Sequence, residues 1–348
     1  MTGAGLLPAD DVGLLGVPRD ALESWLRGTG CVEPPFVVRR IGNGQSNITC
    51  VATGADGRRV VLRRPPHGAR PGSGHDVARE SRVIAALAGS SVRVPRVFGA
   101  LDHDGAAPVV AMSCVDGQPL DRAGVAALGP QARRRAGLSL AQTLAAVHDV
   151  DIDAVGLGTL ASRAPYGPRQ ISRWTRQWEA TRTRELPVLD ELAGRLRRST
   201  PPQRETRLVH GDLHPGNVLV DPVDGSVVAA LDWELCTLGE PVADLGTLLA
   251  YWPEPGEPSP VGVAVSTADG FPTRAELVAE YATASGRDVS DVGFWHALGL
   301  WKLAIICEGI VRRATSDARN RAEGWTPARE TVDEVAEGAF VVARAAGL

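Results

Sequence analysis

Short runs of alternating apolar and polar residues fill the first third of the chain, and a period of two is typical of β-strands. β-Branched residues dominate these runs, and glycine or proline residues bound them. The pattern predicts two strands around a glycine turn at 35–54, and single strands at 58–64, 94–101 and 107–115. Apolar residues spaced three and four apart predict helices at 18–27 and 75–89.

The pattern changes after Asp116 and Gly117, where helical spacing takes over. Helices are predicted at 130–150, 168–198 and 241–252, and over most of the chain from residue 271 onward. Short strands and loops are predicted at 208–221 and 226–234, where apolar runs enclose polar residues.

The order of these elements predicts an α+β fold with two lobes, a small β-rich lobe followed by a large helical one. We place the first lobe at residues 1–112, a hinge at 113–117 and the second lobe at 118–348. The length of 348 residues suits two such lobes. Ligand sites commonly lie between domains, so binding residues are expected in both lobes.

Composition narrows the class of protein. The net charge of −4 argues against a dedicated nucleic-acid binder, and no apolar run reaches the roughly 18–20 residues that span a bilayer. The N-terminal residues are acidic where a signal peptide is basic, and the five cysteines never form a CxxC pair. We therefore expect a cytoplasmic protein without a nucleic-acid or membrane partner. Lys302 is the only lysine, which constrains any mechanism that needs a cation.

The segment LVHGDLHPGNVLVD, residues 208–221, holds the main candidate chemistry. Asp212 and Asn217 form the pattern D-x-x-x-x-N in a Pro-Gly loop, and Asp232 follows in ALDWE. Phosphoryl transfer needs an aspartate that accepts or orients the acceptor hydroxyl, and oxygen ligands that hold Mg²⁺ against nucleotide phosphates. Each residue alone is typical of a turn or a cap. Their combination is harder to explain in that way and favours phosphoryl transfer.

LVHGDLHPGNVLVD and ALDWELCTLGEPVADLG resemble the two signature segments of the aminoglycoside phosphotransferase family, which has a protein-kinase-like fold. The resemblance extends over most of the chain and is strongest to the branch whose kinase-like domains are fused to acyl-CoA dehydrogenases. It implies ATP and Mg²⁺ as cofactors, Asp212 as the catalytic base, and Asn217 and Asp232 as metal ligands. It also implies that His214 approaches the transferring phosphate.

The resemblance gives supporting roles to two further residues. His210 would support the loop that carries Asp212, and Asp244, in PVADLG, would fix that loop rather than contact substrate. An acid stabilised by the dipole of a helix N-terminus is the simpler alternative for Asp244.

The first lobe is then expected to bind the nucleotide. In IGNGQSNITC, Gly42 and Gly44 let backbone amides approach phosphate oxygens, with Ser46 as a hydroxyl donor. Asn-Gly in a hairpin is also a common turn, which is the alternative reading. VVAMSCVDGQPL resembles the hinge between the lobes, where backbone groups around Met112 and Cys114 would bind an adenine edge.

Kinase-like enzymes generally carry a lysine on the third strand, paired with a glutamate on a helix, and VVLRRPP offers no lysine. Strand alternation places Arg63 and Arg64 on opposite faces. The order of residues favours Arg63 as the substitute, with Glu80 as its partner. A solvated arginine on an edge strand is the alternative.

For several other residues the sequence allows two assignments, to the acceptor site or to the core. Glu308, on an apolar helix, either pairs with Lys302 or Arg312 or faces the acceptor. Several tryptophans either line an apolar pocket or belong to the core: Trp174, Trp178, Trp252, Trp295 and Trp301.

Together these residues predict an ATP-dependent small-molecule O-phosphotransferase that acts on a hydroxyl of a natural product, an antibiotic or a hydroxyacyl metabolite. Between Ser162 and Thr200, nine arginines against four acids suit an anionic or neutral acceptor better than a polycation, unless they form a solvated face. The alternative function is a non-catalytic nucleotide-binding module, which the missing lysine favours. A protein kinase lacks support, because no APE motif follows Asp232.

Overall fold

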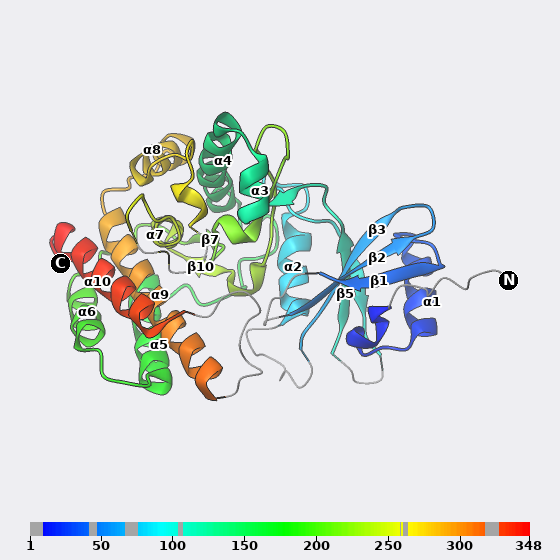
Figure 1. Ribbon diagram of the computed structural model, residues 1–348, viewed down its shortest axis with the longest axis horizontal. Helices are drawn as coiled ribbons and strands as arrows, with labels where there is room; N and C mark the ends of the chain where they lie inside the picture. Colours follow the sequence, from blue (N-terminus) through cyan, green and yellow to red (C-terminus); the bar gives the residue numbers. More distant parts are fainter. Residues whose placement is uncertain are drawn as a thin grey trace. The chain divides into compact units, whose positions relative to one another are not determined.

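The computed structural model describes residues 10–41, 47–66, 76–103, 107–257, 259, 264–316 and 327–348, and the structural statements below concern these residues. The chain forms two compact units (Figure 1). The first contains Met1–Ala85 and Pro95–Val115, and the second contains Ala86–Val94 and Asp116–Leu348.

An antiparallel sheet forms the centre of the first unit (Figure 1). Its strands are β1 (Phe36–Arg40), β2 (Ile48–Gly54), β3 (Arg59–Arg64), β4 (Val97–Leu101) and β5 (Val109–Ser113). They lie in the order β1-β2-β3-β5-β4. Each strand falls within a predicted range, because period-two alternation matches a sheet that is covered differently on its two faces.

The two faces of this sheet are covered by different helices. The 3-10 turn η1 (Asp11–Leu15) and helix α1 (Arg19–Thr29) share one buried cluster with Val60 and Leu62 of β3. Helix α2 (Val77–Leu87) contributes Val77 to a second cluster, against which Val61 packs. β3 therefore presents odd-numbered residues to α2 and even-numbered residues to η1 and α1, as strand alternation predicted.

The second unit is mainly helical. Its helices are α3 (Arg122–Ala127), α4 (Pro130–His148), α5 (Tyr166–Thr181), α6 (Pro187–Arg198), α7 (Pro241–Ala250), α8 (Arg274–Ser285), α9 (Val292–Ser316) and α10 (Arg329–Ala345). Two small sheets accompany them, with orders β6-β8-β9 and β10-β7. Their strands are β6 (Gln118–Pro119), β7 (Arg207–Val209), β8 (Val218–Val220), β9 (Val227–Ala230) and β10 (Thr237–Gly239). The predicted α+β class, with a small β-rich part and a large helical part, is confirmed.

The residues predicted to be helical at 168–198 form two helices, and residues 182–186 between them lie outside both. The chain leaves helical geometry at Arg182 and enters α6 at Pro187, which occupies the first turn. Proline lacks the amide hydrogen that a continuing helix needs, but it suits the start of a new helix. The periodicity on both sides was right, and the proline marked the boundary.

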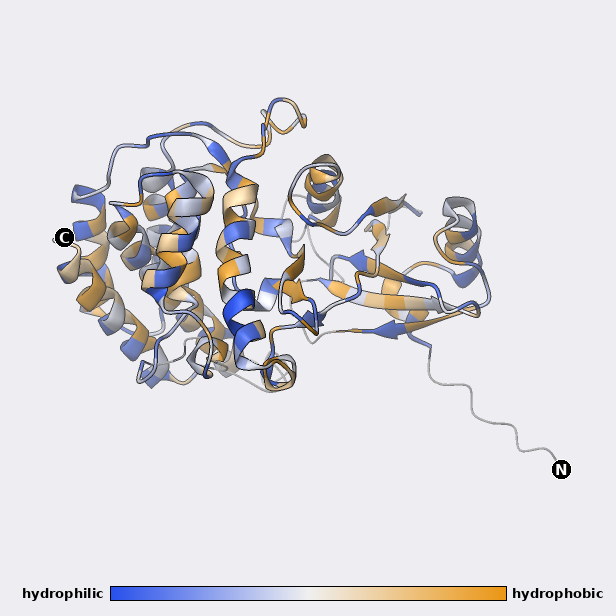
Figure 2. Ribbon diagram, turned by 90° about the horizontal axis from the view of Figure 1, so that it is seen from above, coloured by the Kyte–Doolittle hydropathy of each residue, from blue (hydrophilic) through white to orange (hydrophobic). Residues whose placement is uncertain are grey.

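Helix α9 forms the middle of the main core of the second unit. Buried residues of α5, α6, α7 and α10 join it in one cluster, and Figure 2 shows orange and blue residues mixed along these helices. No membrane span was predicted from the sequence. By length and composition alone, the helix Val292–Thr315 is long and apolar enough to cross a membrane. However, 83% of its most apolar stretch is buried inside the structure, as in a core helix.

Helices α7 and α9 approach closely through glycines. A Cβ atom added to Gly246 would lie 2.3 Å from the backbone carbon of Trp295, and one added to Gly299 would lie 2.7 Å from the carbonyl oxygen of Gly246. No side chain fits at these positions without moving backbone, so the two glycines set the spacing between α7 and α9.

We predict that Gly246→Ala lowers the free energy of unfolding by about 1–3 kcal/mol or more, because the new methyl group overpacks the contact between α7 and α9. Gly338→Ala on α10 is the matched control, since nothing lies within 4 Å of its added Cβ. The control should stabilise the protein by up to about 1 kcal/mol, because alanine favours a helix interior. Urea unfolding measures both, and equal effects would contradict the close contact.

Candidate active site

The loop after β7 is held by the buried carboxylate of Asp244. One oxygen of Asp244 accepts the amide hydrogen of His210 at 2.6 Å, and the other accepts that of Gly211 at 2.9 Å. Asp244 lies in the first turn of α7 and is 1% exposed. The expected fixing role is therefore seen directly. The helix dipole also favours an acid at this position, so the two readings of Asp244 are compatible.

Gly211 is required at the turn that precedes Asp212. Its φ of +85° lies in the left-handed region, and an added Cβ would lie 2.6 Å from the carbonyl oxygen of Leu235. Its own carbonyl accepts a hydrogen bond from Nζ of Lys302 at 3.0 Å. Hydrogen bonds thus fix this peptide segment from both sides. Asp244 accepts from its amides, and Lys302 donates to its carbonyl.

His210 supports the same loop from its side chain. The imidazole is fully buried, with Nε2 3.0 Å from the carbonyl oxygen of Leu231 and its ring 4.5 Å from that of Trp233. Burial lowers the pKa of His210, so the ring is neutral near pH 7 and Nε2 can donate to the carbonyl. The predicted supporting role fits this arrangement.

Asp212 is an ionised carboxylate in a partly enclosed setting. Burial alone raises the pKa of Asp212, but the nearby side chains of His214 and Lys302 outweigh it and hold the pKa below its usual value. Burial together with the Asp212 carboxylate raises the pKa of Tyr251 well above its ordinary value. Asp212 is therefore available as an acceptor of hydrogen bonds or of a proton.

His214 is oriented by two contacts. Its Nδ1 accepts the amide hydrogen of Gly216 at 3.0 Å, and its ring stacks on Tyr251 with centroids 4.2 Å apart. Because Nδ1 acts as an acceptor, the neutral ring carries its hydrogen on Nε2. That atom lies 3.7 Å from the carboxylate of Asp212.

Asn217 is tied to Asp212 through its side-chain amide. Nδ2 lies 2.8 Å from the carbonyl oxygen of Asp212 and 3.4 Å from its carboxylate. Its Oδ1 has no protein partner among the described residues. The Asn217 carbonyl accepts the amide hydrogen of Leu231 at 2.8 Å, which brings Asp232 to the same end of β8 and β9.

Asp232 has a φ of +63°, and it is the only non-glycine residue with positive φ in the described part of the chain. Such a conformation is costly for a residue with a side chain and gathers at functional sites. No three His, Cys, Asp or Glu side chains of the described residues group as a metal site. Asn217 and Asp232 offer two hard oxygen donors, which suits Mg²⁺, since that ion usually takes few protein ligands and keeps waters and phosphate oxygens.

In the first unit, Arg63 and Glu80 form the predicted ion pair. Nε of Arg63 lies 3.1 Å from the Glu80 carboxylate, and the side chains are 14% and 2% exposed. Arg64 points to the other face, where its guanidinium donates to the carbonyls of Pro65 at 2.9 Å and Leu15 at 2.8 Å. The strand register predicted from alternation is confirmed. Gly42, Gly44 and Ser46 lie outside the described residues.

Met112 and Cys114 differ in their surroundings. Met112 is buried in β5 opposite Val61 and belongs to the cluster under α2. Cys114 follows the end of β5, and its backbone amide and carbonyl have no hydrogen-bond partner among the described residues. Both residues remain predicted adenine contacts. The backbone groups of Cys114 are the ones left available for a hydrogen bond with a ligand.

Sequence reasoning missed Lys302 and Tyr251 at this site. Lys302 contacts the residue before Asp212. Glu308 accepts hydrogen bonds from the amide and hydroxyl of Thr183 at 2.9 and 2.5 Å, and its carboxylate lies 4.0 Å from Nε of Arg184. Contacts between segments so distant in sequence leave no periodic signal. That Lys302 is the only lysine of the chain was the one feature of the sequence that could have drawn attention to it.

The tryptophans are mostly core residues, as one of the two readings expected. Trp178, Trp252, Trp295 and Trp301 are 0–3% exposed. Trp174 is 9% exposed, and Nζ of Lys302 lies 5.6 Å from the centroid of its ring. Only Trp174 of this set therefore contacts a residue of the candidate site.

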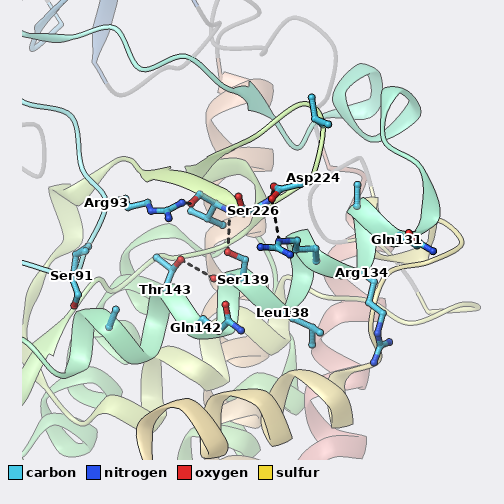
Figure 3. A pocket seen from close by; sticks show the side chains of 16 residues that line it. Ser91, Arg93, Gln131, Arg134, Leu138, Ser139, Gln142, Thr143, Asp224 and Ser226 are labelled. Carbon is cyan, nitrogen blue, oxygen red and sulfur yellow. Dashed lines mark hydrogen bonds and ion pairs between the residues drawn. The ribbon is translucent and has the colours of Figure 1, made fainter.

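A groove of about 990 Å³ lies elsewhere on the second unit, between α4, residues 91–93 and the loop that joins β8 to β9 (Figure 3). Its polar groups are largely paired with each other. Arg93 donates to the carbonyl of Val227 at 2.7 Å, and Ser139 accepts the amide hydrogen of Val227 at 2.9 Å. None of the candidate site residues lines it.

Comparison with known proteins gives a family match over most of the chain. The family model described as phosphotransferase enzyme family matches residues 37–279. Mouse acyl-CoA dehydrogenase family member 10 is 32% identical over 320 residues, which cover 88% of this chain and 30% of that protein. Rat acyl-CoA dehydrogenase family member 11 is 30% identical over 316 residues, 89% of this chain and 40% of that protein. The chain thus spans less than half of these relatives.

Solved structures share the fold. A Ralstonia eutropha protein with the provisional name aminoglycoside phosphotransferase superposes with a TM-score of 0.75 at 28% identity, covering 95% of this chain and 98% of that one. The GDP complex of aminoglycoside 2′-phosphotransferase-IIIa gives a TM-score of 0.58 at 17% identity, over 88% of this chain and 92% of that one. The second likeness concerns the fold alone.

We predict that Asp244→Asn lowers the free energy of unfolding by about 1–3 kcal/mol, because an amide cannot accept both buried amide hydrogens with the strength of a carboxylate. Asp221→Asn is the control, since Asp221 accepts amide hydrogens in an exposed turn that asparagine also suits. Urea unfolding compares the two. Equal and small effects would show that the loop does not depend on Asp244.

Proposed function

Because the chain belongs to the phosphotransferase enzyme family, we propose that it is an ATP-dependent small-molecule O-phosphotransferase with Asp212 as the base. The observation that carries this proposal is the fixed group of Asp212, Asn217 and His214 after β7. In the proposed reaction, the acceptor oxygen bonds to the γ-phosphorus and the bond from that phosphorus to the bridging oxygen breaks. ADP leaves, and the hydroxyl proton passes to Asp212.

The lowered pKa of Asp212 indicates how this proposed base would act. A carboxylate held ionised by His214 and Lys302 is a weak base, so it orients the hydroxyl early and takes the proton only as the new bond forms. That timing suits the loose transition state of phosphoryl transfer, in which the nucleophile carries little charge. Orientation by Asp212 then contributes more than proton abstraction.

His214 is proposed to donate a hydrogen bond to the transferring phosphate. With Nδ1 engaged by Gly216, the ring presents an Nε2 hydrogen toward the space beside Asp212. A donor at that place would hydrogen-bond a phosphoryl oxygen and stabilise its charge. The stack on Tyr251 keeps the ring in this orientation.

Asn217 and Asp232 are proposed to hold Mg²⁺ through Oδ1 and the carboxylate. When bound, the ion would supply positive charge that neutralises the nucleotide phosphates. The chain's own contribution is the fixed position of these oxygens, since the amide of Leu231 ties the carbonyl of Asn217 to the residue before Asp232.

The first unit is proposed to bind ATP. Arg63, held by Glu80, supplies the cation that a lysine supplies in most kinase-like enzymes. Gly42, Gly44 and Ser46 are proposed to contact the phosphates, and the backbone at Met112 and Cys114 the adenine. The GDP-bound relative supports nucleotide binding by this fold.

The acceptor is proposed to be a small hydroxylated molecule: a natural product, an antibiotic or a hydroxyacyl metabolite. The names of the mouse and rat relatives favour the last, and the name of the Ralstonia protein favours an antibiotic. We propose a cytoplasmic protein without nucleic-acid or membrane partners, since the five cysteines are free thiols, as in a reducing compartment.

A second candidate is a non-catalytic nucleotide-binding module. The observation that favours it is the arginine at position 63, which is bulkier than the usual lysine. The two candidates differ in turnover, because only an enzyme gives Mg²⁺-dependent nucleotide hydrolysis or transfer that requires Asp212.

We predict that Asp212→Asn lowers kcat by about 10²–10⁴-fold, because the amide cannot accept the hydroxyl proton. Nucleotide affinity, measured by calorimetry, should stay close to that of the native protein. Asp224→Asn, an exposed acid in the loop after β8, is the control and should keep full turnover. ADP release in the presence of a verified acceptor measures the rate. Near-native turnover by Asp212→Asn would remove this residue from its role.

We predict that Arg63→Ala raises the KM for ATP and lowers kcat, because the phosphates lose their cation. Arg64→Ala should leave both nearly unchanged but lower the midpoint of thermal unfolding, because its guanidinium holds the carbonyls of Leu15 and Pro65. Steady-state kinetics and melting curves on both variants test this. The reverse ranking in KM would contradict the assigned role of Arg63.

A further inference from the structure

Two cations lie over the ring of Trp174 in the second unit. Nζ of Lys302, from α9, is 5.6 Å from the ring centroid, and the guanidinium carbon of Arg173, from α5, is also 5.6 Å away. An aromatic ring attracts cations through its electron-rich face, by about 0.5–1 kcal/mol at an exposed site. Arg173 lies there because it directly precedes Trp174 in the chain, whereas Lys302 reaches the ring from α9.

Lys302 has unused hydrogen-bonding capacity. An ammonium group has three donors. One bonds to the Gly211 carbonyl at 3.0 Å, and no other hydrogen bond or ion pair of this side chain is found among the described residues. Burial and the charge of Arg173 lower the pKa of Lys302, whereas Asp212 and Asp244 raise it. The group therefore sits where a further anion would stabilise it.

Arg173 is exposed and has no hydrogen-bond or ion-pair partner among the described residues. Arg176, Arg182, Arg197 and Arg198 of the same segment likewise have no such partner among the described residues, whereas four other arginines are engaged. Arg163 pairs with Asp153, Arg184 with Asp333 and Arg195 with Glu191, while Arg169 donates to two backbone carbonyls. Arg173 is thus an arginine next to the candidate site whose charge no acid of the described chain neutralises.

The nearby acids are already engaged. Both oxygens of Asp244 accept amide hydrogens, from His210 and Gly211. Asp212 lies 3.7 Å from Nε2 of His214 and must remain open to the proposed acceptor hydroxyl. Both carboxylates act on Lys302 through their charge, but neither is hydrogen-bonded to Lys302 or Arg173 among the described residues.

We infer that the acceptor carries a negatively charged group, a carboxylate or a phosphate, that binds Lys302 and Arg173 beside Trp174. This inference rests on the proposed phosphotransfer at Asp212, because Lys302 is bonded to the residue before it. An anion there would receive charge-assisted hydrogen bonds from both cations, and its apolar part would contact Trp174. The same two charges repel a polycation, so aminoglycosides are excluded as good acceptors.

Matched pairs of alcohols test the charge requirement. A homologous series of 3-hydroxy acids is compared with the methyl esters, and glycerol 3-phosphate with glycerol, so that each pair keeps its hydroxyl and differs in charge. Kanamycin represents a polycation. Acceptor-stimulated ADP release by the full chain with Mg²⁺ and ATP is measured. The charged member should have the higher kcat/KM by about tenfold or more, as for one lost charged hydrogen bond. The two series also show whether carboxylate or phosphate is preferred.

Variants locate the binding site of the charge. Arg173→Gln and Lys302→Met should each raise the KM for the charged acceptor by about 10- to 100-fold. Their KM for the neutral partner should change much less. Arg197→Gln, on an exposed arginine of α6, removes the same charge and should leave both KM values unchanged. Because Lys302 also holds Gly211, Arg173→Gln is the decisive variant.

The outcomes separate this inference from the proposed function. Equal or better use of the esters, glycerol or kanamycin overturns it, as does an unchanged KM in Arg173→Gln. If no charged acceptor stimulates turnover but basal ATP hydrolysis is lost in Asp212→Asn, the inference fails and the phosphotransferase proposal stands. If hydrolysis does not depend on Asp212, both fall.

Discussion

The carboxylate of Asp244 is the constraint on which the candidate site depends. It accepts two successive amide hydrogens, those of His210 and Gly211, from within the buried start of α7. An isolated buried carboxylate is unfavourable, and here two amide donors and the helix N-terminus offset that cost. The chain after β7 therefore leaves its strand in one fixed direction, and Asp212 follows directly. The close packing of α7 on α9 through glycines gives Asp244 a rigid support.

Lys302 links this support to the acceptor side. α9 carries it to the carbonyl of Gly211, so the same helix that packs on α7 also holds the other side of the loop. Its charge helps to keep Asp212 ionised, and Arg173, over the ring of Trp174, adds a second positive charge on α5. Holding the base and selecting the acceptor would then depend on one residue. The single lysine of the chain therefore indicates more about the proposed site than the many arginines do.

The sequence predicted the strands and the ion pair of the first unit well, because alternation in a two-faced sheet assigns Arg63 and Arg64 to opposite sides. It also predicted the role of Asp244, since the motif that carries it was recognisable. It could not predict that Lys302 reaches Gly211 or that Glu308 turns to Thr183, because these contacts join segments far apart in the chain. The break in the helix before Pro187 could have been predicted from the sequence, because proline starts helices more easily than it continues them.

The central claim is that the loop after β7, which carries Asp212 and Asn217, and the residues after β9, which carry Asp232, bring these three side chains to a common point. A crystal structure of the protein with Mg²⁺ and a non-hydrolysable ATP analogue tests it most directly. The account predicts a metal ion bound by Oδ1 of Asn217 and the carboxylate of Asp232, with the γ-phosphate next to Asp212. A metal and nucleotide bound away from these three side chains would contradict it.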